Sequence, residues 1–134
     1  MKLLRYGDCG NELPGLMDRE GRIRSLQGIV TDIGPEALLR LDELRRLDEA
    51  SLPLVTNPQR LGPCVTGVRK FLCIGVNYSD HAAESGMAVP KEPILFMKAT
   101  SAIMGPNDQV IIPRNSQKTD WEVELGVVIG KRAL

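Results

Sequence analysis

The chain has 134 residues, of which 43% are hydrophobic and 25% charged, the balance of an ordinary globular protein. Lysine plus arginine and aspartate plus glutamate both number 17, so no net field favours nucleic acid or an anionic membrane as a partner. The first residues lack the apolar core of a signal peptide, no stretch is long enough to span a membrane, and the 3 cysteines are widely spaced. We therefore expect a cytoplasmic protein with reduced thiols.

Residues 1–65 are predicted to form a small α/β module, a meander followed by a helix and a linker. Apolar patterning predicts strands over 2–6, 15–18 and 22–26. Leucines at every third position predict one helix over 37–47 that packs against the meander. No chemistry is evident in this module.

Proline and glycine concentrate between residues 52 and 70, which predicts an extended connector and a domain boundary near residue 65. The second domain would then occupy 66–134. Its first element is the apolar run 71–76, typical of a strand buried on both faces. Ser79 is predicted to N-cap the short helix that follows, and Gly86 to end it in a left-handed conformation.

His81 and Glu84 lie three positions apart on this helix, which places them on one face. A carboxylate beside an imidazole raises its basicity and fixes its orientation, as a water-activating general base requires. The alternative, held equal from spacing alone, is a surface His–Glu pair without a catalytic role.

A proline-bracketed loop at 87–93 either covers a site or only connects two elements. The strand predicted over 94–98 ends in Lys98, a candidate to bind an anionic substrate group, although a lysine at a strand end is more often simply solvated. Residues 109–112 predict a further strand.

The segment 120–130 predicts a strand that carries Glu122 and Glu124 on one face. Their backbones would be about 6.5–7 Å apart, so the like charges repel unless a hard divalent cation such as Mg²⁺ or Ca²⁺ compensates them. The alternative is the solvated face of an antiparallel strand. The same face continues with small, apolar residues, which favours a concavity.

Three ordered motifs together resemble the fumarylacetoacetate hydrolase family, and they span 71–84, 92–98 and 120–130. The resemblance covers the second half of the chain. Residues 1–65 are similar to the small N-terminal module of bacterial members, including those labelled ureidoglycolate lyase or 2-hydroxyhepta-2,4-diene-1,7-dioate isomerase. The resemblance implies an α+β, β-rich fold in which 66–134 form the first part of a mixed β-roll.

The resemblance also implies a metal-dependent hydrolase or lyase that acts on a small oxo- or hydroxy-carboxylate in catabolism, as a homodimer in its full-length form. Glu122 and Glu124 match two ligands of a divalent ion, commonly Mg²⁺ and sometimes Mn²⁺ or Ca²⁺. His81 and Glu84 match a dyad that prepares a water or moves a proton, and Lys98 falls where the family builds part of its substrate pocket. The type of reaction stays open among C–C hydrolysis, decarboxylation or isomerisation, and C–N lysis of the ureidoglycolate type.

One departure concerns a third metal ligand, an aspartate that follows the two glutamates in the family. No acidic residue follows Glu124 in this chain. We therefore expect a truncated chain that binds metal weakly and shows little turnover. The alternatives are a non-catalytic remnant that serves as a binding or dimerisation module, and a generic β-rich domain with chance motifs.

Overall fold

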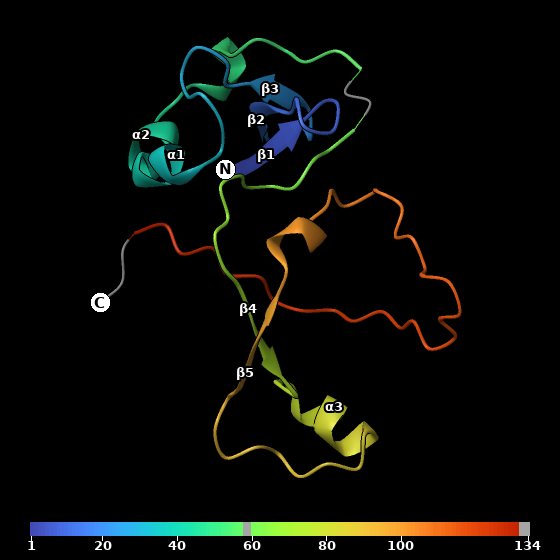
Figure 1. Ribbon diagram of the computed structural model, residues 1–134. Helices are drawn as coiled ribbons and strands as arrows, with labels where there is room; N and C mark the ends of the chain where they lie inside the picture. Colours follow the sequence, from blue (N-terminus) through green and yellow to red (C-terminus); the bar gives the residue numbers. More distant parts are fainter. Residues whose placement is uncertain (58–59, 132–134) are drawn as a thin grey trace. The chain divides into compact units, whose positions relative to one another are not determined.

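The computed structural model describes residues 1–57 and 60–131 (Figure 1). Its chain forms two compact units: residues 1–67 together with the stretch from Met104 onward, and Val68–Ile103. Each unit contains an antiparallel sheet and short helices. This confirms the α+β fold class, whereas the predicted domain boundary near residue 65 stays a prediction.

The first unit is built on a three-stranded meander of β1 (Lys2–Tyr6), β2 (Leu13–Met17) and β3 (Ile23–Ser25), in the order β1-β2-β3. Both pairings are antiparallel. The local signals of alternation and tight turns therefore predicted this sheet correctly, with shifts at the ends of β2 and β3.

The single helix predicted over 37–47 is wrong, because the chain forms α1 (Pro35–Leu39) and α2 (Leu41–Leu44). The break falls at Arg40, whose φ of −103° and ψ of 18° leave the helical region. The Arg40 guanidinium donates to the Ile29 carbonyl oxygen at 2.8 Å and also binds Glu43, so side-chain contacts stabilise the break. A short 3₁₀ turn, η1 (Glu49–Ser51), follows.

Apolar side chains pack on both faces of the meander. One cluster joins the sheet to α1 and α2 and contains Leu16, Leu26, Val30, Ile33, Ala37, Leu44 and Leu52. The other contains Leu4, Tyr6 and Ile23, with Leu61 of the connector packed against it. The N-terminal module therefore has its own hydrophobic core, which supplies most of its stabilisation.

The connector after η1 lies beside the sheet at residues 53–55 and 60–62. Isolated antiparallel bridges pair Arg24 with Leu54 and Tyr6 with Leu61. The Gly62 amide donates to the Arg5 carbonyl oxygen at 2.9 Å. The predicted extended conformation is therefore present, and it provides edge contacts to β1 and β3.

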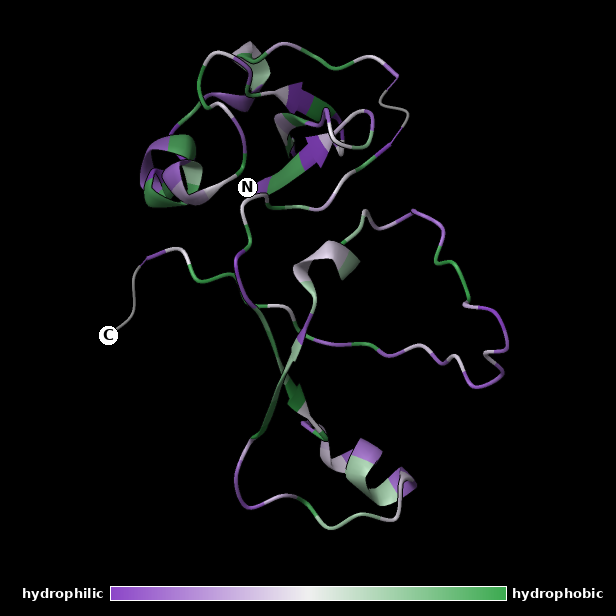
Figure 2. Ribbon diagram, viewed as in Figure 1, coloured by the Kyte–Doolittle hydropathy of each residue, from purple (hydrophilic) through white to green (hydrophobic). Residues whose placement is uncertain are grey.

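The second unit contains β4 (Phe71–Gly75), α3 (Ser79–Glu84), β5 (Ile94–Lys98) and the 3₁₀ turn η2 (Thr100–Ala102). β4 and β5 pair antiparallel, with Phe71 opposite Lys98. The prediction that the first strand is buried on both faces is wrong, since Leu72 is 52% exposed. In Figure 2 the ribbon of β4 has the colour of hydrophobic residues, although its apolar side chains, Leu72 among them, are exposed.

From Met104 to Lys131, the described chain carries no named helix or strand, so the strands predicted over 109–112 and 120–130 are wrong for this structure. A strand requires a hydrogen-bonded neighbour, and alternation alone does not supply one. Trp121 and Leu125 are accordingly 82% and 80% exposed. Within residues 1–57 and 60–131, no helix combines the length and apolar character that crossing a membrane requires.

Candidate functional site

His81 and Glu84 are both carried by α3 in the second unit. The predicted N-cap is off by one residue: Tyr78, in an extended conformation, occupies that position, and Ser79 is the first helical residue. The Asp80 carboxylate accepts a hydrogen bond from the His81 amide at 3.0 Å and lies in the first turn, where a negative charge is favourable.

The C-terminal end of α3 is closed by a Schellman motif, as the glycine at 86 predicted. Gly86 has a φ of 65°, in the left-handed region. Its amide donates to the Ala83 carbonyl oxygen at 3.1 Å, and the Met87 amide donates to the Ala82 carbonyl oxygen at 2.8 Å. His81 lies within one turn of this cap, so the cap holds in place the part of the helix that carries the imidazole.

Val76, the first residue after β4, has a φ of 51°. A β-branched side chain rarely adopts this conformation, which costs on the order of 1–3 kcal/mol. The strained position lies directly after β4 and before the segment that leads into α3. Strain of this kind clusters at functional sites, so it marks the β4–α3 turn as a place where backbone geometry matters.

The side chain of His81 is half-buried, and that of Glu84 is exposed. Among the polar contacts of the described residues, none joins these two side chains. Lys98 is the exposed last residue of β5, and the hydroxyl residues Thr100 and Ser101 follow it in η2. The roles given to His81, Glu84 and Lys98 therefore stay predictions.

Glu122 and Glu124 belong to the other compact unit and are exposed. Their carboxylate oxygens are of the type that Mg²⁺ and Ca²⁺ prefer. In the part of the chain that the structure describes, however, no three His, Cys, Asp or Glu side chains gather closely enough to hold a metal ion. The donor chemistry of the two carboxylates suits a hard cation, and the metal-binding role of Glu122 and Glu124 stays a prediction.

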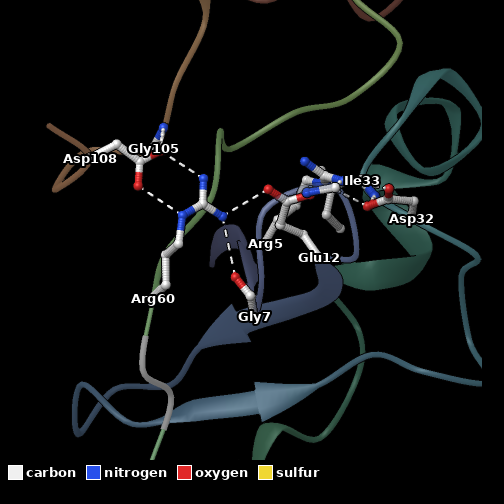
Figure 3. Close-up of polar contacts among 9 residues, drawn as sticks. Arg5, Gly7, Glu12, Asp32, Ile33, Arg60, Gly105 and Asp108 are labelled. Carbon is white, nitrogen blue, oxygen red and sulfur yellow. Dashed lines mark hydrogen bonds and ion pairs between the residues drawn. The ribbon is translucent and has the colours of Figure 1, made fainter. Parts of the chain in front are cut away.

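A feature that the sequence did not reveal is a chain of alternating charges in the first unit (Figure 3). We call it the Arg–acid network, and its members are Asp32, Arg5, Glu12, Arg60 and Asp108. Partners along it are as far as 48 positions apart in sequence, so no local pattern could have predicted the pairing. The only local hint is the Gly-Pro-Asn-Asp turn at 105–108.

The Arg–acid network contains two bidentate pairs, the strongest geometry for such contacts. Arg5 donates to both carboxylate oxygens of Asp32, at 2.7 and 2.9 Å. Arg60 donates to both oxygens of Asp108, at 2.7 and 2.6 Å. Glu12, whose side chain is 6% exposed, joins the two arginines at 3.3 and 2.8 Å.

These contacts lower the pKa values of Glu12 and Asp108. The hydrogen bond from Arg60 lowers the pKa of Glu12 below its usual value and outweighs the opposing effect of burial. The hydrogen bond from Arg60, with one from the Gly105 amide, likewise lowers the pKa of Asp108. Both carboxyl groups therefore hold their negative charge well into the acidic range, and the network stays paired.

The second unit and the segment from Met104 onward carry all the residues selected from the sequence. Residues 70–134 match the family model described as Fumarylacetoacetate (FAA) hydrolase C-terminal. The matched range of the FAA hydrolase model contains His81, Glu84, Lys98, Glu122 and Glu124. It begins next to β4, so the N-terminal meander and its helices lie outside it.

Two curated relatives extend the similarity over nearly the whole chain. A Burkholderia ambifaria protein named "Putative hydrolase" is 59% identical over 132 residues, which make up 97% of this chain and 47% of that protein. A Burkholderia cenocepacia protein, likewise named as a "Putative hydrolase", is 58% identical over 134 residues, with 98% and 48% covered. The chain thus spans about half the length of the curated relatives it matches.

A solved structure shares the fold. The crystal structure of a "putative HpcE protein" from Mycobacterium smegmatis superposes with a TM-score of 0.63 and 23% sequence identity. The superposition covers 85% of this chain and 41% of that one. At this identity the likeness concerns the arrangement of the backbone, and it agrees with the α+β fold expected from the sequence.

Proposed function

We propose that this chain belongs to the FAA hydrolase family and that the whole protein is an enzyme of the hydrolase or lyase type. The observation that carries the proposal is the family match over 70–134, because it contains every residue selected from the sequence for chemistry. The names of the Burkholderia relatives support the hydrolase class. The substrate we propose is a small oxo- or hydroxy-carboxylate.

In this proposal Glu122 and Glu124 supply two of the oxygen ligands of a divalent cation, with Mg²⁺ preferred and Mn²⁺ or Ca²⁺ as alternatives. Such a cation, when bound, stabilises negative charge that develops on a substrate oxygen as a neighbouring bond breaks. The described residues bring no third acidic side chain to these two carboxylates. The roles proposed next for His81, Glu84 and Lys98 are therefore argued without the ion.

The proton-transfer role belongs to His81, the chain's single histidine. Its neutral imidazole accepts a proton from a water or from the substrate. Glu84 lies three positions along α3, where its negative charge is near enough to stabilise the resulting imidazolium. Their position on a helix whose C-terminal end is closed by backbone hydrogen bonds supports this assignment, because a fixed helix turn limits where the ring can lie.

Substrate binding is assigned to Lys98 at the end of β5. Its ammonium group would pair with the substrate carboxylate, and Thr100 and Ser101 lie close behind it in sequence as neutral donors. We further propose that the full-length enzyme is a cytoplasmic homodimer with no nucleic-acid or membrane partner. The balanced charge of the chain supports the second half of that statement.

A second candidate function is a non-catalytic binding or dimerisation module. One observation favours it for the 134-residue chain by itself: the strongly exposed apolar side chains of β5 and of the segment 120–130. In that case the glutamates would be structural.

The decisive experiment uses the full-length form, with a Mg²⁺ titration and a screen of 2-oxo acids, acylpyruvates and ureidoglycolate. His81→Ala should lower kcat by about 10²–10⁴-fold and leave metal affinity nearly unchanged, because the imidazole moves a proton and does not bind the ion. Glu122→Gln should weaken metal binding instead. Ala83→Ser, an exposed change on the same helix, is the matched control.

Two outcomes would contradict the assignment. If His81→Ala abolishes metal binding while Glu122→Gln leaves it intact, the roles are reversed. If the 134-residue chain alone turns over a substrate with Mg²⁺ at rates typical of enzymes, the expected incompleteness of its ligand set is wrong. We expect weak metal binding and little turnover from that chain.

A further inference from the structure

The connector residues 60–62 are fixed on the N-terminal module by backbone hydrogen bonds. The Gly7 amide donates to the Arg60 carbonyl oxygen at 3.0 Å, and the Gly62 amide donates to the Arg5 carbonyl oxygen at 2.9 Å. Between them, Leu61 pairs with Tyr6 and packs in the second apolar cluster. This short stretch is therefore a continuation of the meander's edge and not a free linker.

The turn at 105–108 lies directly against this stretch. Arg60 binds the Asp108 carboxylate through two hydrogen bonds, while Asp108 also accepts one from the Gly105 amide at 2.7 Å (Figure 3). A Cβ atom at Gly105 would overlap the Leu61 carbonyl oxygen, a backbone atom that cannot rotate away. Electrostatic and steric observations thus agree that the two backbones meet here.

The Arg60–Asp108 pair does not stand alone. Arg60 also donates to the Gly7 carbonyl oxygen at 3.2 Å and to Glu12 at 2.8 Å. Glu12 in turn pairs with the buried Arg5. The side chains of Arg60 and Asp108 are 21% and 22% exposed, so the pair is shielded from most of the solvent screening that weakens surface ion pairs.

The position of this contact in the sequence gives it a further role. Residues 60–61 precede the second unit, and residues 105–108 follow it. We propose that the contact between them, which lies within the first unit, is a staple that ties together the chain entering the second unit and the chain leaving it. The inference goes beyond the proposed function and does not depend on it.

The physical advantage is entropic. β4 and β5 are joined by residues 76–93, and bringing the two strands together costs conformational entropy. The staple lies outside both strands and already holds the flanking chain at 60 and 108 together, which removes part of this cost before the strands pair. Opening the staple should therefore loosen β4 and β5, although Asp108 is not part of either strand.

Amide hydrogen exchange on the full 134-residue chain tests the proposal. Asp108→Ala removes the ion pair, and Gly105→Ala forces the two backbones apart. Each should raise exchange at residues 105 and 108 by about tenfold or more and raise it several-fold in β4 and β5, with β1 and β2 unchanged. Asp108→Asn keeps an acceptor for the Gly105 amide, so its effect should be smaller.

Matched controls come from the same stretch of chain. Asp120→Ala removes an exposed aspartate whose carboxylate accepts a hydrogen bond from the Trp121 amide, and Gly126→Ala adds a methyl group with no described atom within 4 Å. Both should leave exchange in β4 and β5 within about twofold of the parent. The proposal is overturned if Asp108→Ala and Gly105→Ala behave like these controls, or if they raise exchange in β1 and β2 as much as in β4 and β5.

Discussion

Val76 and Gly86 flank α3 with similar left-handed φ angles of 51° and 65°, but only one of them is glycine. A side chain in this conformation costs about 1–2 kcal/mol. Gly86→Ala should therefore lower the unfolding free energy of the second unit by about 1 kcal/mol, and Val76→Gly should not lower it. Urea unfolding followed through the Ala82 methyl resonance measures both effects.

Gly86→Asn provides the graded control, because asparagine tolerates the left-handed region better than alanine. Its loss of stability should fall between those of the parent and Gly86→Ala. Equal losses for alanine and asparagine would show that the cap does not depend on backbone conformation.

At the same scale, the lowered pKa values of Glu12 and Asp108 predict that the folded chain loses stability in acid. A carboxyl group whose pKa is lowered by folding stabilises the native state above its unfolded pKa, and this contribution is lost as the pH falls through the folded value. The urea midpoint should thus be steady from about pH 7 to pH 5 and fall below about pH 4.5.

Glu12→Gln tests the source of that fall. The variant should have a lower midpoint at neutral pH, because Arg5 and Arg60 lose a charged partner, and a shallower decline in acid. Glu20→Gln, a change at a glutamate whose side chain is 67% exposed, is the control. A decline as steep in Glu12→Gln as in the parent would assign the acid sensitivity to other groups.

At the scale of elements, the N-terminal core and the segment 120–130 should respond differently to truncation. Leu16 and Leu44 are both 1% exposed, so replacing either by alanine should cost about 2–5 kcal/mol of unfolding free energy. Leu125→Ala should cost less than about 0.5 kcal/mol, because that side chain is 80% exposed. Chemical denaturation measures all three.

The same measurement would also show whether the segment 120–130 packs as the predicted strand in solution. A cost at Leu125 comparable to that at Leu16 would mean that 120–130 packs against a partner in solution. Val65, which packs against the first cluster from the connector, offers an intermediate reference.

The elements that the sequence predicted well are those whose signals are local. The meander, the strands at 71–75 and 94–98, and the helix closed by Gly86 each follow from alternation, turn residues and a cap within the element itself. The strand at 120–130 failed because pairing depends on a neighbour that its own residues cannot specify. The helix break at Arg40 depends on the Ile29 carbonyl oxygen, again outside the pattern.

The candidate site divides in the same way. The roles of His81, Glu84 and Lys98 stay predictions from residue type, spacing and resemblance, whereas the structure confirms the helix and the strand that carry these residues. The Arg–acid network could not be predicted, because each ion pair joins residues that only the folded chain brings together. Whether Glu122 and Glu124 bind an ion depends on further ligands, which their spacing cannot reveal.

At the scale of the whole molecule, exposed apolar side chains predict self-association. Leu95 on β5 is 63% exposed, and Met97 beside it is 67% exposed, on a two-stranded ribbon with unpaired edges. Sedimentation should show a mass that rises with concentration. Leu95→Lys should weaken this association, because a charge on an edge strand opposes pairing with another copy.

Leu39→Lys is a closely matched control, since Leu39 is also 63% exposed but lies on α1. It should leave association unchanged. A stable monomer over the whole concentration range would contradict the predicted self-association. Equal effects of the two lysine substitutions would contradict its assignment to the exposed apolar side chains of β5.

The short connections of the meander have a consequence for biosynthesis. All buried members of both apolar clusters lie between Leu4 and Leu52, so their contacts involve small separations along the chain. A nascent polypeptide can therefore complete this module while the ribosome is still translating the codons for β5. The salt link from Arg60 to Asp108 then forms late, when the emerging turn at 105–108 docks onto an already folded platform.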